Sequence, residues 1–283
     1  MFTQLLTLGI YTAIYTSFAL WSAPVFWQSG VGFLVAAHGV HHQSQCYNLS
    51  TALRQTSSGP LLSWMFYVPM ALAGVPPLVF GIVALIDLLY QFWVHTEQVG
   101  KLGWFDRVFC SPSNHRVHHA INDEYLDKNY GGILIVWDRL FGTFHEESQT
   151  CVYGTRAPLE SWDPLWANAQ IYAGLLKDSW HAERWLDKVR VWLKPPGWRP
   201  AELEARAPKS PFDLASITTY NPPISRATQW AAAGLFLLLL QGVSLLLWFA
   251  DRLPSAQLAL GSALLVAGYW SVGKLMGVRF QLF

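Results

Sequence analysis

The clearest pattern in this sequence is a set of long runs without charged side chains. Four runs lack Lys, Arg, Asp and Glu, at residues 1–53, 55–86, 227–250 and 253–273. A helix rises about 1.5 Å per residue, so the last two runs would span about 36 and 31 Å, enough to cross the hydrocarbon core of a bilayer. We therefore predict a hairpin of two transmembrane helices at residues 228–276, with its turn at residues 251–254.

The run at residues 55–86 is interrupted by prolines at positions 60, 69, 76 and 77. Proline stops or kinks a helix. We therefore predict a membrane hairpin at residues 61–95, made of two shorter helices that meet at Pro76 and Pro77 and need not cross the bilayer fully. The apolar segment at residues 1–32 has the length of one span, and it lacks the basic start of a secretory signal.

Charged residues concentrate in the middle of the chain. Residues 96–227 hold 15 of the 19 basic and 16 of the 18 acidic residues, so we expect this region to lie in water. Positively charged loops stay on the cytoplasmic side of a membrane, which places this region and both ends of the C-terminal hairpin in the cytoplasm. The prediction is an all-α integral membrane helical bundle with a cytoplasmic cap, and with a linker at residues 201–227.

Composition excludes several other classes of protein. Charged residues make up 13% of the chain, about half of their usual share in soluble domains. A net charge of +1 argues against a nucleic-acid partner. Three cysteines without a CxxC pair argue against both a disulfide scaffold and a zinc ribbon.

Histidines supply the candidate chemistry. The pattern His-x-x-His-His occurs twice, and its members are His38, His41 and His42 in the first copy and His115, His118 and His119 in the second. On a helix these positions share one face, so each copy can present three imidazoles to a common point. Neutral imidazole suits iron, zinc, copper and nickel. We therefore predict that both copies bind metal.

Another histidine, His95, lies between the two patterns at the end of the second apolar run, and we expect it to be a seventh ligand. Glu97 either orients a ligating imidazole or is a solvated charge. His145 and His181 belong to neither pattern, so we expect them at the surface. Six or seven histidines exceed the needs of one four-coordinate zinc, so two metal ions are expected.

A histidine-rich site beside apolar helices suits O₂-dependent attack on a C–H bond of a lipid. The reason is that neutral ligands leave a metal pair cationic and electrophilic. Hydrolysis by a metal-bound hydroxide is the alternative, but it ordinarily keeps carboxylate ligands nearby. We therefore favour an oxygenase over a hydrolase.

The segments around these histidines resemble the sterol desaturase and fatty acid hydroxylase superfamily. The main ones are AAHGVHHQSQCYNLSTALRQ (36–55), LLYQFWVHTEQVGKLG (88–103) and SNHRVHHAINDEYLDKNYGGILIVWDRLFGTF (113–144). With VYG (152–154) and LKPPGWRP (193–200), the resemblance covers about residues 33–200, the expected catalytic region. It implies a non-haem di-iron centre in a histidine-rich cap and a lipid substrate that enters from the bilayer. The implied iron ligands are His38, His41, His42, His95, His115, His118 and His119.

Within the superfamily the segments are most similar to the alkylglycerol monooxygenases, and this likeness implies tetrahydrobiopterin as the reduced electron donor. Two further residues stand in matching segments. Asn129 lies in the polar turn at residues 127–132, which either brings backbone close to the site or simply connects two elements. Asp138 either orients a histidine or pairs with Arg139 at the surface.

The sequence departs from the superfamily before His38. The superfamily carries an earlier box of His-Arg-x-x-His type, and Val25 and Ser29 stand where its two histidines are expected. Either the true start lies upstream and residues 1 to about 30 are a mis-called or frameshifted segment, or the protein has lost the box and is impaired. The absence of charge in residues 1–53 favours the first explanation.

Together these features predict a membrane-bound di-iron monooxygenase that hydroxylates an ether lipid, a sterol or a related long-chain lipid. One alternative is a sphingolipid or carotenoid hydroxylase or desaturase of the same superfamily. Another is a metal-binding membrane protein without turnover. The expected partners are the lipid, O₂ and the electron donor, with no nucleic acid.

Overall fold

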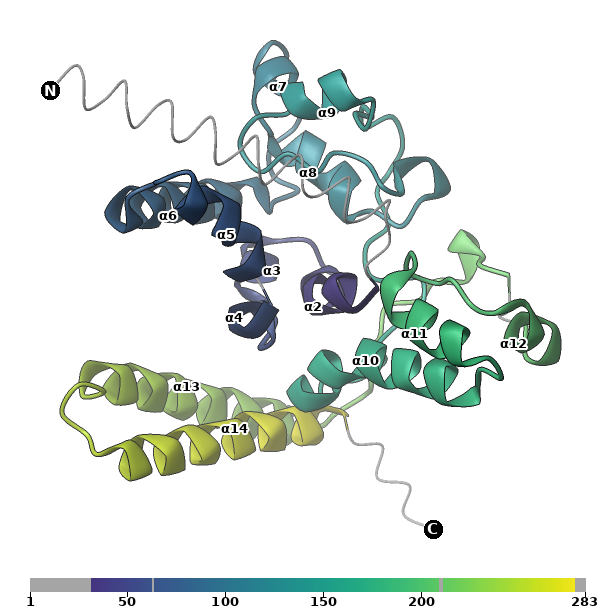
Figure 1. The fold of residues 1–283 in the computed structure, drawn as a ribbon. Helices are drawn as coiled ribbons and strands as arrows, with labels where there is room; N and C mark the ends of the chain where they lie inside the picture. The colour runs from purple at the N-terminus through teal and green to yellow at the C-terminus, as the bar shows by residue number, and fades with distance from the viewer. Residues whose placement is uncertain (1–31, 63, 209–210, 278–283) are drawn as a thin grey trace, which may run out of the picture. The chain divides into compact units, whose positions relative to one another are not determined.

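The computed structural model describes residues 32–62, 64–208 and 211–277, and every regular element within these ranges is a helix. The all-helical architecture predicted from the sequence is thus confirmed for these residues (Figure 1). Contacts divide the chain into two compact units. These are Met1–Pro158 with Ile171–Ile217, and Leu159–Gln170 with Thr218–Phe283.

The first unit is built mostly from short helices. They are α2 (Gly32–His42), α3 (Leu49–Leu53), α4 (Gly59–Leu62), α5 (Trp64–Leu72), α6 (Pro77–Val94), α7 (Phe105–Val108), α8 (Pro112–His119), η1 (Asp123–Tyr125), α9 (Val136–Phe141) and α11 (Trp185–Leu193). Helix α10 (Pro164–His181) begins in the second unit and ends in the first. The segment at residues 201–227, expected as a linker, contains α12 (Ala201–Arg206) and η2 (Leu214–Ser216).

Helix α6 begins where the prolines predict. Pro76 is its N-cap and Pro77 occupies its first turn, a position where proline loses no hydrogen bond and has a suitable φ. Gly74, with φ +77°, lies in the turn that follows α5. At 18 residues and a mean hydropathy of 1.8, α6 is long and apolar enough to cross a membrane, whereas α5 has only 9 residues. The sequence left open whether the helices of this hairpin cross the bilayer fully, and α6 has the length to do so.

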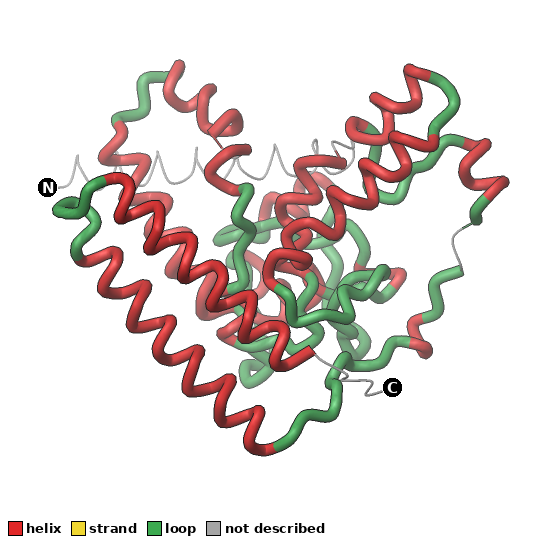
Figure 2. Tube along the Cα trace, turned by 90° about the horizontal axis from the view of Figure 1, so that it is seen from below, coloured by secondary structure: helices red, strands yellow, loops and turns green. Residues whose placement is uncertain are grey.

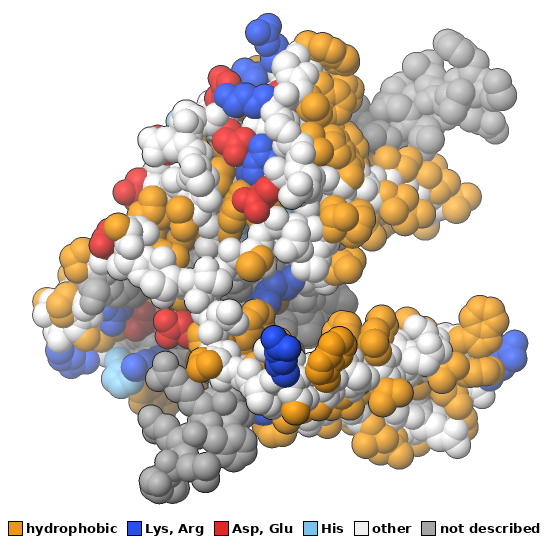
Figure 3. Space-filling view, turned by 180° about the vertical axis from the view of Figure 1, so that it is seen from behind, with side chains coloured by type: hydrophobic (Ala, Val, Ile, Leu, Met, Phe, Trp, Pro, Cys, Tyr) orange, Lys and Arg blue, Asp and Glu red, His pale blue; other side chains and the backbone are white. Residues whose placement is uncertain are grey.

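The second unit contains a hairpin of two long helices, α13 (Arg226–Trp248) and α14 (Ser255–Gly277). Both are long and apolar enough to cross a membrane, with mean hydropathies of 2.0 and 1.3. Hydrophobic side chains cover much of their surface (Figure 3). Glycines let the two helices approach closely, because a Cβ at Gly268 would collide with the side chain of Leu239.

The segment between α6 and α10 forms a cap in which loops connect short helices (Figure 2). The buried core behind α8 consists of Tyr47, Val117, Ala120, Tyr125, Cys151 and Tyr153. The Tyr125 hydroxyl accepts hydrogen bonds from the backbone N–H groups of Ser148 (2.8 Å) and Gln149 (2.6 Å). This core fixes the helix that carries the second histidine pattern, because Val117 lies within that pattern and is fully buried.

Candidate metal centre

Three helices bring seven histidines together. Helix α2 ends with the first histidine pattern, α8 ends with the second, and His95 is the C-cap of α6. The ring nitrogens form two groups, and within each group the candidate ligand atoms all lie within 4.8 Å of one another. The inner group is His41, His95, His115 and His119, and the outer group is His38, His42 and His118. Each sequence pattern thus contributes to both groups.

The inner group is buried, and its Nε2 atoms converge. Nε2 of His95 lies 3.1 Å from Nε2 of His41 and 3.2 Å from Nε2 of His119. It also lies 3.1 Å from Nε2 of His115. Metal–nitrogen bonds of about 2.1 Å at tetrahedral angles place neighbouring ligand nitrogens about 3.4 Å apart. The observed separations are close to this value, so the four imidazoles are spaced as ligands of one ion.

Backbone carbonyl groups fix the other ring nitrogen of three histidines. The Nδ1–oxygen distances are 3.1 Å for His41 to Arg54, 2.6 Å for His95 to Gln91, and 3.3 Å for His118 to Lys128. A carbonyl oxygen only accepts, so Nδ1 carries the proton in each ring and Nε2 carries a lone pair. The lone pairs of His41 and His95 therefore face each other, an arrangement that a bound cation stabilises.

The outer group contains a nitrogen without a partner. Nε2 of His42 is buried and has no hydrogen bond within the described ranges. The His42 ring centroid lies 4.8 Å from that of His38 and 4.8 Å from that of His118. Leaving a buried acceptor unpaired costs about 1–3 kcal/mol, and a metal ion at this point would remove that cost. The outer group fits a second ion with three protein ligands and open coordination positions.

Burial keeps these imidazoles uncharged. It lowers the pKa of His95 to about 4 and that of His118 to about 4. Burial also lowers the pKa of His41, although the hydrogen bond to the Arg54 carbonyl opposes this shift. Neutral imidazole is the form that binds a metal ion. The cluster therefore has the right protonation state for ligation at neutral pH.

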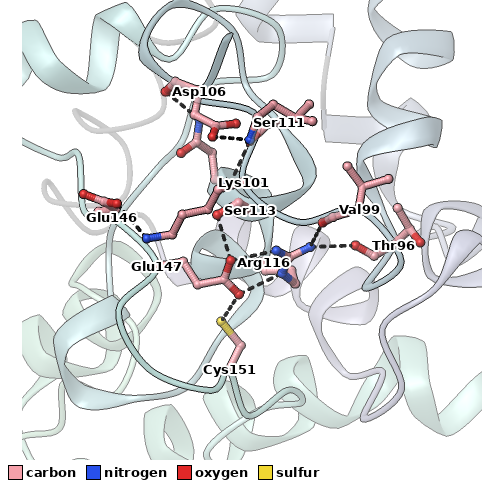
Figure 4. Close-up of polar contacts among 12 residues, drawn as sticks. Thr96, Val99, Lys101, Asp106, Ser111, Ser113, Arg116, Glu146, Glu147 and Cys151 are labelled. Atoms are coloured by element: carbon pink, nitrogen blue, oxygen red, sulfur yellow. Dashed lines mark hydrogen bonds and ion pairs between the residues drawn. The ribbon is translucent and has the colours of Figure 1, made fainter. Parts of the chain in front are cut away.

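Arg116 lies within the second pattern, and its guanidinium group bonds to Glu147 and to the segment that follows His95 (Figure 4). Its Nε and Nη2 atoms donate to the two carboxylate oxygens of Glu147 at 2.8 and 2.7 Å. Its Nη1 donates to the carbonyl oxygens of Thr96 at 2.9 Å and Val99 at 2.8 Å. Because Thr96 directly follows His95, Arg116 fixes the two ligand-bearing segments relative to each other.

Arg54 supports the end of α2, and the sequence did not predict this role. Its Nε donates to the carbonyl oxygen of Val40 at 2.7 Å, and its Nη2 donates to Oε1 of Gln43 at 3.0 Å. The side chain thus holds the end of α2, while its own carbonyl oxygen contacts His41. Its position as the first charged residue of an apolar segment was the available signal.

Tyr47 was also missed by our reading of the sequence. Its ring is buried, with its centroid 5.2 Å from that of His119 and 5.6 Å from that of His95. The Tyr47 hydroxyl donates to the carbonyl oxygen of Val94 at 3.0 Å, and its ring stacks on Tyr153. Tyr47 therefore forms an apolar wall of the inner group and ties it to the end of α6.

Glu97 and Asn129 lie apart from the imidazoles. Glu97 is exposed, a position that agrees with a solvated charge. Asn129 is fully buried, and its amide nitrogen donates to the carbonyl oxygens of Asn114 at 3.0 Å and His145 at 2.8 Å. Asn129 thus supports the start of α8 through backbone contacts.

Asp138 is buried and holds a turn. Its carboxylate accepts hydrogen bonds from the backbone N–H groups of Tyr130 and Gly131, each at 2.8 Å, and from the Thr143 hydroxyl at 2.6 Å. Burial raises the pKa of this carboxyl group. The guanidinium group of the neighbouring Arg139 stacks over the Phe144 ring and does not pair with Asp138. The Asp138 carboxylate therefore ties the turn at residues 130–131 to Thr143 and α9.

The remaining sequence expectations concern residues away from the cluster. His145 is half-buried against Tyr125, and His181 is exposed, so neither joins the two groups. Val25 and Ser29, where an earlier histidine box was expected, lie outside the described residues.

Comparisons with known proteins point to one family. A model of the fatty acid hydroxylase family matches residues 10–143, a range that begins before residue 33. The alkylglycerol monooxygenase of Danio rerio is 45% identical over 172 residues, which are 61% of this chain and 38% of that protein. The human alkylglycerol monooxygenase is 37% identical over 223 residues, which are 71% of this chain and 50% of that protein.

A bacterial relative is more distant. The ornithine lipid hydroxylase of Rhizobium tropici is 33% identical over 78 residues, which are 28% of this chain and 24% of that protein. The chain spans half or less of the length of each of these relatives. No solved structure matches it. The resemblance seen in the histidine segments is confirmed, and the chain belongs to the fatty acid hydroxylase superfamily.

Proposed function

We propose that this protein is an O₂-dependent lipid monooxygenase that holds two irons on its seven clustered histidines. The observation that carries the proposal is the division of these side chains into two groups, each compact enough for one ion. Relatives named alkylglycerol monooxygenase and ornithine lipid hydroxylase support a lipid C–H bond as the target. The region at residues 96–227 is proposed to face the cytoplasm, because it holds 15 of the 19 basic residues.

Each group of histidines would hold one iron of such a centre. The inner group would hold one iron with four imidazoles, and the outer group would hold the other with three. Carbonyl oxygens at Gln91 and Lys128 leave Nε2 of His95 and His118 as the ligating atom. Bound iron would supply the activation of O₂. Neutral imidazoles do not offset the charge of the metal ions, so the centre stays electrophilic.

The position of the centre favours a substrate from the bilayer. His95 directly follows α6, which has the length and hydropathy of a membrane span. In the proposed reaction one oxygen atom of O₂ enters a C–H bond and the other leaves as water. A reduced donor supplies the two electrons that this requires. We propose an ether lipid as substrate, with a sterol or related long-chain lipid next, and tetrahydrobiopterin as donor by resemblance.

Iron content and oxygen uptake test this function together. The full chain, purified in detergent and loaded with ferrous iron, should retain about two irons. It should consume O₂ only when an alkylglycerol and a reduced pterin are both present. Parallel assays with a sterol, a sphingolipid and a carotenoid compare the alternative substrates. Retention of a single zinc, with no lipid-dependent oxygen uptake, would contradict the proposal.

A metal-binding membrane protein without turnover is the rival function. The observation that favours it is the lack of any histidine before His38 in this sequence, where the superfamily carries another box. Iron retained by the chain, with no oxygen uptake for any of these lipids, would favour the rival. Hydroxylated lipid recovered in proportion to the O₂ consumed would exclude it.

A further inference from the structure

The outward face of α11 is apolar. Trp185, Leu186, Val189 and Leu193 are all exposed, and Trp185 is exposed to 82%. At about 100° per residue, these four positions fall within one sector of about 100° on the helix surface. Val191, which is buried at 2% exposure, points to the opposite side. Helix α11 therefore has one face packed on the protein and a second apolar face without cover among the described residues.

The end of α10 continues this apolar surface in the sequence. Leu176 and Trp180 are one helical turn apart and are exposed to 59% and 77%. The Lys188 ammonium group donates to the carbonyl oxygen of Trp180 at 2.8 Å, and the Ser179 hydroxyl donates to the carbonyl oxygen of Lys188 at 2.9 Å. These bonds join the end of α10 to α11. We call Leu176, Trp180, Trp185, Leu186, Val189 and Leu193 the α10–α11 stripe.

Basic side chains accompany the stripe. Lys177, Arg184, Arg190 and Lys194 are exposed within residues 176–194, while Glu183 is the one exposed acidic residue of that range. Exposed tryptophans with Lys and Arg nearby are typical of helices that lie in a membrane interface. Anionic headgroups attract such basic residues.

The buried sides of the same helices support the metal-bearing helix. Helix α11 packs against α2, and a Cβ at Gly39 of α2 would meet Ile171 of α10. Gly39 lies between His38 and His41 in the first histidine pattern. The layer that carries the stripe is therefore in direct contact with the helix that supplies three of the seven histidines.

We propose that the α10–α11 stripe lies in the headgroup region of a bilayer that contains anionic lipid. In this position α10 and α11 hold α2, and with it the histidine cluster, at the membrane surface. The exposed basic residues of the same segment favour a lipid surface of negative charge as the occupant.

Spin labels measure whether the stripe is in lipid. The full chain, with the exposed Cys46 replaced by serine, receives one label at Val189→Cys or at Thr150→Cys, an exposed position in a loop of the cap. Each variant is reconstituted in vesicles of phosphatidylcholine with and without phosphatidylserine. Relaxation by O₂, which partitions into lipid, is compared with relaxation by a water-soluble nickel chelate.

The label at position 189 should be more accessible to O₂ than to the nickel chelate, and the label at position 150 should show the reverse. Phosphatidylserine should increase the contrast at position 189, and the double variant Arg184→Gln, Lys194→Gln should lose that increase. High accessibility of position 189 to nickel would overturn the proposal, because the stripe would then lie in water. Protection of position 189 from both reagents would overturn it too, because protein would then cover the stripe.

Discussion

At the scale of single residues, the metal centre depends on which ring nitrogen each histidine leaves free. In the inner group, His41 and His95 use Nδ1 for a backbone carbonyl oxygen, and their Nε2 atoms converge. In the outer group, the Nε2 atom of His42 is buried without a partner. The two groups consist of different side chains, so single substitutions should separate them.

Removing His42 should release one of two bound irons. In the His42→Ala variant the outer group keeps only two imidazoles, whereas the inner group keeps all four, so iron per chain should fall from about two to about one. Metal analysis after removal of free iron measures the content. His145→Ala is the matched control, because His145 joins neither group, and it should leave the content unchanged. Equal loss in both variants, or no loss in His42→Ala, would contradict the assignment of the two groups.

The ion pair between Arg116 and Glu147 should contribute more to stability than the neighbouring pair between Lys101 and Glu146. The side chains of the first pair are 9% and 18% exposed, and those of the second are 50% and 69% exposed. Breaking a buried pair costs about 3–5 kcal/mol, whereas an exposed pair contributes about 0–1 kcal/mol. Arg116→Met should therefore lower the unfolding free energy by about 3 kcal/mol, whereas Lys101→Met should have little effect on it.

Thermal unfolding in detergent, followed by circular dichroism, compares these two variants. Glu147→Gln should destabilise in the same direction as Arg116→Met, because it leaves the guanidinium group without its anion. If Arg116→Met and Lys101→Met lowered the Tm equally, the buried pair would have no special role in fixing α8.

The sequence revealed the seven histidines but not the residues that orient them. Spacing along one helix placed His38 beside His41 and His42, because helical periodicity is a local property. The contact between the Tyr47 hydroxyl and Val94 joins residues 47 positions apart, and no local pattern predicts it. No local pattern predicts the role of Asp138 either, because its bonds to the backbone of residues 130 and 131 depend on how the turn folds back on α9.

At the scale of elements, two features matter most: where each helix starts, and how closely neighbouring helices pack against each other. Pro76 and Pro77 set the start of α6, as the sequence predicted. In the C-terminal hairpin, the approach of α13 and α14 depends on glycine. Gly261 and Gly268 of α14 face leucine side chains of α13, whereas Gly234 has no neighbour within 4 Å of an added Cβ. The sequence predicted the hairpin from its apolar length, but this difference among glycines requires the packed structure.

Valine at position 268 should destabilise the hairpin. An added Cβ would collide with Leu239, and overpacking of this kind costs about 1–3 kcal/mol. Gly234→Val is the matched control, because an added Cβ there meets nothing within 4 Å. The fraction of folded chain in titrations with a denaturing detergent compares the two variants. Equal stability of Gly268→Val and the unchanged chain would show that the two helices do not pack through this glycine.

At the scale of the whole molecule, uneven charge is the feature that relates the parts to a membrane. Among the residues that the structure describes, three helices have the length and hydropathy of membrane spans, and they are α6, α13 and α14. The sequence predicted α13 and α14 as spans from uncharged runs, because crossing a bilayer requires a long apolar segment. It left open whether the hairpin that contains α6 crosses fully. Charge also predicts which side each loop occupies, and this prediction is independent of how the two units are arranged.

The turn between α13 and α14 should lie on the opposite side of the membrane from the histidine-bearing cap. Arg226 and Lys274, at the two ends of this hairpin, should remain in the cytoplasm with the basic cap. In a chain that carries Cys46→Ser, a cysteine at Thr150 and a cysteine at Asp251 should therefore react with a membrane-impermeant maleimide from opposite sides of sealed vesicles. The native Cys110 and Cys151 are buried and provide the unreactive background. Labelling of both engineered cysteines from the same side would contradict either the spanning hairpin or the cytoplasmic cap. Glycosylation acceptor sites inserted at the same two positions would distinguish these cases, because only a lumenal or external loop is modified.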